Sequence, residues 1–142
     1  MTKEEKELLL KDLCARLPYE VKVLYLRDFN HDWYNLEKVD IGDNELYVTT
    51  YESYENKYVK VEDALPYLFT LSSMTEEQKR DLTNLFNCTV VITEWEIIFP
   101  NYYDSNMDNW NKAFNWCYKN HFDCNGLIPL GLAIDATNLN IY

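Results

Sequence analysis

The sequence is poor in the residues that interrupt regular structure. Its 142 residues include three glycines and four prolines, so long flexible linkers are not expected. The glycines stand at positions 42, 126 and 131, too far apart to form a loop that cradles phosphate. A chain of this length is typical of one domain. We therefore expect a single domain over residues 1–142 without a glycine-rich nucleotide-binding loop.

Long apolar runs are also missing. The chain begins with charged residues and a run of three leucines, whereas a signal peptide has an apolar stretch of roughly 7–15 residues. No segment approaches the roughly 18 apolar residues of a membrane-spanning helix. We expect a cytoplasmic protein without membrane contact, whose cysteines stay reduced. These cysteines are Cys14, Cys88, Cys117 and Cys124.

Positive charge is scarce. The chain has 13 Lys and Arg against 24 Asp and Glu, a formal net charge of −11. Lys and Arg balance Asp and Glu within residues 1–30, so the whole excess lies in the remaining chain. Such a charge repels phosphate backbones, and we expect no direct binding of nucleic acid. It attracts a basic protein partner, or it serves solubility alone.

Apolar and aromatic residues are abundant, at 47% and 15% of the chain, which excludes a disordered protein. Capping boxes at Thr2 with Glu5 and at Thr75 with Gln78 predict the starts of two helices. A third helix is predicted from Ser105, because apolar residues then recur at helical spacing. Alternation predicts strands over 20–28, 46–51 and 58–61, the last two as a hairpin, and a strand or hairpin over 88–99.

Three segments have weaker patterns. Residues 29–44 are polar and predict no definite element, residues 62–69 predict a short helical turn, and the apolar segment 127–134 is expected to pack against the core. The order of elements favours an α+β fold. We expect an antiparallel sheet of about four to five strands with about three helices packed mainly on one face.

Both ends of the chain carry distinctive stretches. The run from Met1 to Tyr19 continues as Val21-Lys22-Val23, and the other end reads Asn120-His121-Phe122-Asp123, Gly126-Leu127-Ile128-Pro129 and Gly131-Leu132-Ala133. Together with Ser72-Ser73-Met74-Thr75-Glu76-Glu77, these stretches resemble a family of short uncharacterised proteins of gut bacteria, their phages and mobile elements. The resemblance implies a bacterial or phage setting in the cytosol. It implies no activity, so no functional residues are carried over from it.

Two patterns resemble metal sites. Cys117, His121 and Cys124 have a spacing that zinc ligands can adopt, with Asp123 or Cys14 as a fourth ligand. Cys117, however, continues an apolar helical stripe, which favours a buried thiol.

Asp104, Asn106 and Asp108 match the start of a calcium loop. Asn109 and Asn115 replace the glycine and the glutamate that such a loop needs. We therefore expect no metal and no cofactor.

Catalysis is the first alternative function. His121 is a candidate base for a Cys124 nucleophile, but no nucleophile elbow is present, and we expect no catalytic residues. A homo-oligomeric structural module is the second alternative.

The region from residue 31 to residue 63 combines an excess of acids with many aromatic residues. Tyrosine and tryptophan are favoured as interface anchors, and acids steer a basic partner. An ordinary hairpin with aromatic cross-strand pairs would show the same composition. We expect a non-catalytic accessory protein that binds a protein partner here, in its narrowest form an acidic inhibitor that mimics nucleic acid. The candidate residues are Trp33, Tyr34, Asp40, Asp43, Glu45, Tyr47, Tyr51, Glu52, Tyr54 and Glu55.

Overall fold

The structure is a computed structural model that describes residues 1–142 except 30–32, 51–55, 87–89, 95 and 99–106. The helices are α1 (Lys3–Arg16), α2 (Glu76–Phe86) and α3 (Met107–Lys119), with 3₁₀ turns η1 (Leu17–Tyr19), η2 (Val61–Asp63) and η3 (Leu71–Ser73). The strands are β1 (Lys22–Tyr25), β2 (Tyr34–Asp40), β3 (Glu45–Thr49), β4 (Asn56–Lys60), β5 (Ala64–Leu68), β6 (Val91–Ile92), β7 (Ile97–Ile98) and β8 (Ile134–Asp135). Within the described ranges, no helix combines the length and the apolar character needed to cross a bilayer.

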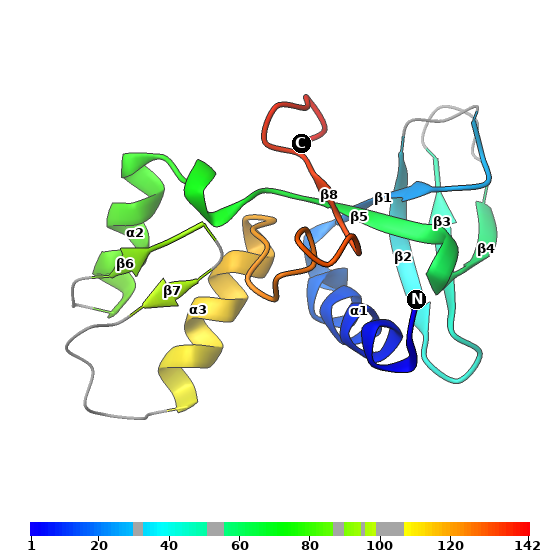
Figure 1. Ribbon diagram of the computed structural model, residues 1–142, viewed down its shortest axis with the longest axis horizontal. Helices are drawn as coiled ribbons and strands as arrows, with labels where there is room; N and C mark the ends of the chain where they lie inside the picture. Colours follow the sequence, from blue (N-terminus) through cyan, green and yellow to red (C-terminus); the bar gives the residue numbers. More distant parts are fainter. Residues whose placement is uncertain (30–32, 51–55, 87–89, 95, 99–106) are drawn as a thin grey trace.

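The main sheet has six strands in the order β4-β3-β2-β1-β5-β8 (Figure 1). All neighbouring strands are antiparallel except β5 and β8, which pair in parallel. The α+β class is therefore confirmed, with more strands than the sequence predicts. The hairpin over β3 and β4 is confirmed as well, and its register places Tyr47 opposite Tyr58.

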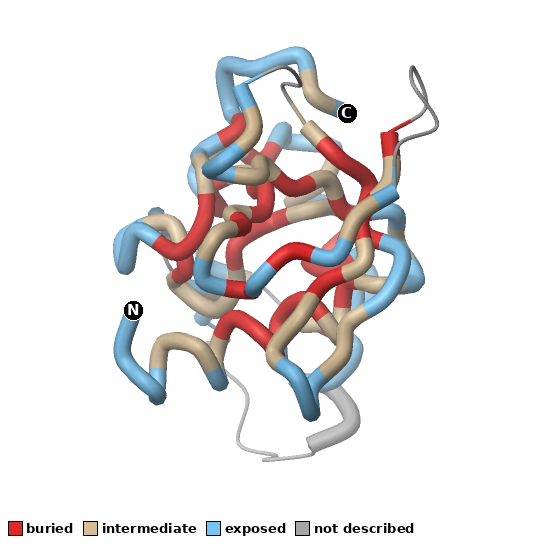
Figure 2. Tube along the Cα trace, turned by 90° about the vertical axis from the view of Figure 1, so that its right-hand side faces the viewer, coloured by how far each residue is buried: buried red, intermediate tan, exposed pale blue. Residues whose placement is uncertain are grey.

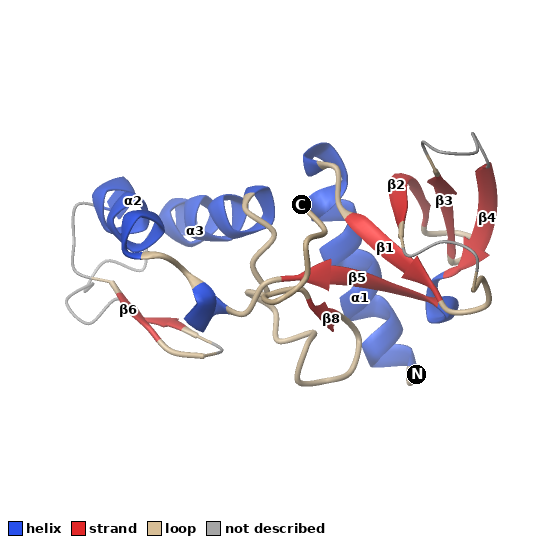
Figure 3. Cartoon of the chain, turned by 90° about the horizontal axis from the view of Figure 1, so that it is seen from above, coloured by secondary structure: helices blue, strands red, loops and turns tan. Residues whose placement is uncertain are grey.

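Helix α1 covers one face of this sheet (Figure 3). The Thr2 hydroxyl accepts from the Glu5 N–H at 3.1 Å, and the Glu5 carboxylate accepts from the Thr2 N–H at 2.6 Å, so the predicted capping box is formed. The buried side of α1 packs against inward-facing side chains of the strands. This first core includes Leu9, Leu10, Leu13, Val23, Leu36, Leu46, Val48, Val59 and Leu68.

Helices α2 and α3 lie beside the sheet, with the β6–β7 ribbon, and form a second core (Figure 1). The capping box at Thr75 and Gln78 is present, with hydrogen bonds of 2.8 and 3.2 Å. The second core includes Leu71, Met74, Leu82, Phe86, Ala113, Cys117 and Phe122. The described apolar residues therefore form two clusters, with α1 packed on the face of the sheet and α2 packed with α3 beside it.

The structure corrects two segments of the sequence prediction. The polar segment 29–44 contains β2, whose Tyr34 and Leu36 are buried in the first core. The segment 62–69 contains β5, which lies between β1 and β8, and the helical turn is confined to η2. Both strands are stabilised by pairing with two neighbouring strands, β2 with β1 and β3, and β5 with β1 and β8. Propensity read along one segment does not reveal such pairing. The segment 88–99 is a hairpin where it is described.

The C-terminal segment packs against the core as expected. Leu127 and Leu132 are buried, and β8 follows them as an edge strand that the sequence pattern does not predict. Buried stretches run through the middle of the molecule, whereas the turns and the two ends are exposed (Figure 2).

Two core substitutions test whether the two cores unfold together. Leu13→Ala in the first core and Leu82→Ala in the second each remove a fully buried side chain, and each is expected to lower the free energy of unfolding by about 2–5 kcal/mol. Urea titration followed by circular dichroism and by tryptophan fluorescence should show one transition, shifted by either variant. The control is Leu130→Ala, at an exposed position. Two separate transitions, each moved by only one variant, would contradict a single cooperative domain.

Candidate functional site

The face of β2, β3 and β4 opposite α1 holds part of the predicted partner-binding set. We call this the outer face and define it by side chains that alternate with the core residues and are not buried. Alternation along a strand sends successive side chains to opposite faces. Of the candidate residues, Asp40, Glu45 and Tyr47 lie here. The outer face comprises Lys38, Asp40, Glu45, Tyr47, Thr49, Asn56, Tyr58 and Lys60, together with Glu37 at the bulge, whose carboxylate accepts from the Thr49 hydroxyl at 3.0 Å.

An aromatic pair occupies the middle of the outer face. Tyr47 and Tyr58 are directly opposite on β3 and β4, and their ring centroids are 5.0 Å apart. The Asn56 amide donates to the Tyr47 hydroxyl at 2.7 Å, which holds that ring in place. Tyr58 is 60% exposed. The pair therefore presents an apolar surface with polar tips, the kind of surface that favours protein contacts.

Oppositely charged pairs flank the tyrosines. Glu45 and Lys60 are directly opposite, and their oxygen and nitrogen lie 2.7 Å apart. Asp40 and Lys38 form a second pair at 3.3 Å. The pKa of Asp40 is lowered, first by the Asp43 N–H and then by Lys38, and the pKa of Lys60 is raised by Glu45. The charge on this face is therefore largely compensated, although the chain as a whole is acidic.

The remaining candidate residues are not gathered on this face. Tyr34 is fully buried, and its hydroxyl donates to the Asp28 carboxylate, so it belongs to the core. The Trp33 ring lies 3.7 Å from the ammonium of Lys22, and Asp43 lies in the turn between β2 and β3. Tyr51, Glu52, Tyr54 and Glu55 lie outside the described residues.

The outer face also contains residues that are missing from the candidate set predicted from the sequence, namely Lys38, Tyr58 and Lys60. The register of the β3–β4 hairpin brings Tyr58 to Tyr47 and Lys60 to Glu45. Alternation along the hairpin, combined with the register of its two strands, would therefore have predicted Tyr58 and Lys60 on this face.

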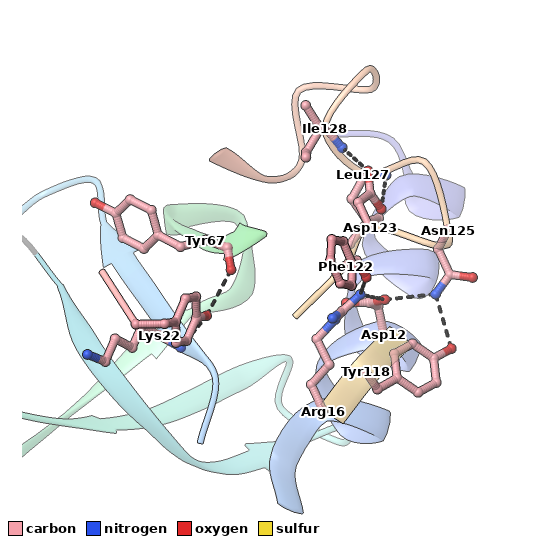
Figure 4. Close-up of polar contacts among 11 residues, drawn as sticks. Asp12, Arg16, Lys22, Tyr67, Tyr118, Phe122, Asp123, Asn125, Leu127 and Ile128 are labelled. Atoms are coloured by element: carbon pink, nitrogen blue, oxygen red, sulfur yellow. Dashed lines mark hydrogen bonds and ion pairs between the residues drawn. The ribbon is translucent and has the colours of Figure 1, made fainter. Parts of the chain in front are cut away.

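A second polar cluster, the buried junction, lies where α1 meets the end of α3 (Figure 4). Its centre is the ion pair of Asp12 and Arg16, both fully buried, with Nε to Oδ2 at 2.5 Å. Arg16 Nη2 also donates to the Phe122 carbonyl at 2.8 Å. Burial alone would lower the pKa of Arg16, but Asp12 outweighs it and the pKa is raised. Arg16 thus stays charged and links α1 to the segment after α3.

Asn125 and Asp123 complete the junction (Figure 4). The Asn125 amide donates to Asp12 at 2.7 Å and to the Tyr118 hydroxyl at 3.2 Å. The buried Asp123 carboxylate accepts from the N–H groups of Leu127 and Ile128 at 2.9 and 2.8 Å, which fixes the following turn.

His121 and Cys124, the candidate residues for zinc binding and for catalysis, lie against Tyr142 and beside Cys117, respectively. The His121 ring stacks on Tyr142 at 3.8 Å, and its backbone φ is 59°. Burial, with the positive charges of Arg16 and Lys22, lowers the pKa of His121 to about 4. A hydrogen bond with Cys117 and burial raise the pKa of Cys124, so its thiol stays protonated.

Metal ligands are not clustered in the described part of the chain, where no group of three or more His, Cys, Asp and Glu could hold an ion. The match to a calcium loop lies mostly outside that part.

The C-terminal end is held beside this junction. The Tyr142 hydroxyl donates to the Tyr67 carbonyl at 2.8 Å and accepts from the Lys22 N–H at 3.1 Å. The Lys22 ammonium donates to the Ile141 carbonyl at 2.5 Å. Tyr142 thereby covers one side of the His121 ring, and burial raises the pKa of Tyr142 to about 12.

Comparisons with protein-family models, with curated proteins and with solved structures found no match to this chain.

The buried ion pair can be tested by removing one partner or both. Arg16→Met leaves Asp12 buried without its cation, and we expect a loss of about 3–5 kcal/mol in the free energy of unfolding. The double variant Asp12→Leu with Arg16→Met should recover much of that loss, because no uncompensated charge remains. Urea titrations of both variants are compared with Lys3→Met, which removes an exposed ion pair. A loss below about 1 kcal/mol for Arg16→Met would contradict the role of the pair.

The low pKa of His121 predicts a pH dependence of stability. The unfolded chain binds a proton near the ordinary pKa of 6.5, and the folded chain does so only near 4. The contribution of neutral His121 to the free energy of unfolding is therefore fully present above pH 6.5, and it is lost as the pH falls from 6.5 toward 4. His121→Asn tolerates the positive φ and should flatten this loss in urea titrations between these pH values. An unchanged pH slope in that variant would assign the effect to other groups.

Proposed function

We propose that this chain is a non-catalytic accessory protein that binds another protein through the outer face of β2, β3 and β4. The observation that carries the proposal is the exposed pair of Tyr47 and Tyr58 on a sheet face that α1 leaves uncovered. Large aromatic side chains contribute much of the binding energy at protein interfaces, because they bury area at low entropic cost.

The surroundings of the tyrosines support a partner with both signs of charge on its contact surface. Lys38 with Asp40 and Glu45 with Lys60 form compensated pairs at the rim of the outer face. The net charge of −11 acts over a longer range and favours the approach of a basic partner. Mimicry of nucleic acid, the narrower form of the proposal, would need uncompensated acids, and it receives less support from this face.

The enzyme alternative receives less support from the geometry. His121 would have to accept a proton from Cys124, but its low pKa makes it a weak base and the Cys124 thiol is held protonated. The stacked Tyr142 also covers one face of the His121 ring. We assign these residues to the packing of the segment after α3.

Capture of the partner tests the proposal. The full chain is immobilised and exposed to lysate of its source organism, and a retained protein is identified by mass spectrometry and then purified. We expect Tyr58→Ala to weaken binding of the purified partner by about tenfold or more, as the loss of an interface anchor does. Leu130→Ala, at an exposed position away from the outer face, is the matched control. Calorimetric titration of the purified pair measures both variants.

Salt concentration separates the contribution of the net charge to binding from that of the aromatic side chains. Binding that depends on the net charge weakens between about 50 mM and 500 mM salt, whereas the aromatic contribution persists. Equal affinity of wild type and Tyr58→Ala would refute the outer face as the site, and retention of no protein at either salt concentration would count against the proposed function.

A further inference from the structure

Strand β4 forms the end of the main sheet. It pairs with β3 on one side, and no described strand lies beyond its other edge (Figures 1 and 3). An edge strand presents unpaired N–H and C=O groups that a further strand can use. We propose that the edge of β4 binds a second copy of the chain, with the two β4 strands antiparallel and centred on Tyr58. This contact between copies goes beyond the proposed binding of a partner and does not depend on it.

Alternation along β4 limits how two copies can pair. Lys57 and Val59 point to the side of α1, whereas Asn56, Tyr58 and Lys60 point to the outer face. Residues directly opposite in an antiparallel pair share a face. A continuous sheet with α1 of both copies on one side therefore requires a register centred on one residue of β4.

Completeness of pairing and charge select among these registers. A register centred on Lys57 leaves Val59 and Lys60 without partners in the other β4, and it places the two copies of Lys57 directly opposite each other. A register centred on Val59 leaves Asn56 unpaired. A register centred on Tyr58 pairs all of β4, with Lys57 opposite Val59 and Asn56 opposite Lys60. No like charges are then opposed, so the strand is complementary to itself.

The tyrosines add an aromatic contact to this register. Tyr58 of each copy would meet the other at the centre, and each is already paired with Tyr47 at 5.0 Å. The outer faces of the two copies would become one surface with a row of aromatic rings. A partner bound there would contact both copies.

Lysines on an edge strand usually prevent pairing, because their charge repels an incoming strand. Both lysines of β4 are compensated within the chain. The Lys57 ammonium lies 2.6 Å from the Asp28 carboxylate, and that of Lys60 lies 2.7 Å from Glu45. What remains against pairing is the long-range repulsion between two chains of charge −11. Salt screens this repulsion, so self-association should strengthen as salt rises.

Sedimentation equilibrium of the purified full chain tests the proposal without any partner. We expect a monomer–dimer equilibrium whose association is tighter at about 500 mM than at about 50 mM salt. A chain that stays monomeric at both salt concentrations up to millimolar protein would overturn the proposal. The proposed partner binding would remain standing in that case, because it is measured separately through Tyr58→Ala.

Two variants of one residue test the register. Asn56→Lys opposes a lysine to Lys60 of the other copy and should weaken the dimer by about fivefold, whereas Asn56→Glu creates attractive pairs and should strengthen it by about fivefold. Both lose the same hydrogen bond to Tyr47, so its loss cannot explain opposite signs. Long-range charge predicts the reverse order, because Asn56→Glu makes each copy more negative.

Asn138→Lys and Asn138→Glu provide matched controls, since they make the same changes in charge at an exposed position in the C-terminal segment. Only the long-range repulsion between copies acts on these controls, so Asn138→Glu should weaken the dimer and Asn138→Lys should strengthen it. Circular dichroism verifies that every variant is folded. A dimer in which the Asn56 variants behave like the Asn138 variants would overturn the pairing through β4.

Discussion

The buried ion pair of Asp12 and Arg16 is the contact on which the arrangement of this protein depends. A charge removed from water must be compensated, and Arg16 meets this need with Asp12 on its own helix and with the carbonyl of Phe122. Phe122 belongs to the second core, whereas α1 packs in the first. The pair therefore fixes the placement of the two cores relative to each other, and Asn125 closes the same network.

This arrangement determines which surface is left for binding. Helix α1 packs on one face of the sheet in the first core, and α2 and α3 pack together beside the sheet in the second core. The other face of β2, β3 and β4 thus keeps its side chains at the surface. Its charges largely compensate one another around Tyr47 and Tyr58. The contacts that it offers to the proposed partner are therefore aromatic and short-ranged, and the net negative charge would act mainly on the approach of that partner.

Sequence patterns predicted the elements whose stability is local. The capping boxes and the β3–β4 hairpin depend on residues close in the chain, and they are found as predicted. Strand β2 escaped prediction because a bulge between Leu36 and Lys38 interrupts its alternation. Strand β5 escaped prediction because Pro66 lacks an N–H and lowers the strand propensity of its segment. In the structure, β1 pairs with the first part of β5, up to Pro66, and β8 pairs with Tyr67 and Leu68.

By itself, the sequence determined the fold class, the starts of α1 and α2, the acidic charge and the surplus of tyrosine, because composition and local periodicity encode these. The tertiary structure alone decided that Tyr34 is buried while Tyr47 and Tyr58 meet at the surface. It alone brought Asp12 to Asn125. The physical reason is the same in each case: pairing register and the packing of distant segments decide which side chains leave water, and no local pattern specifies either.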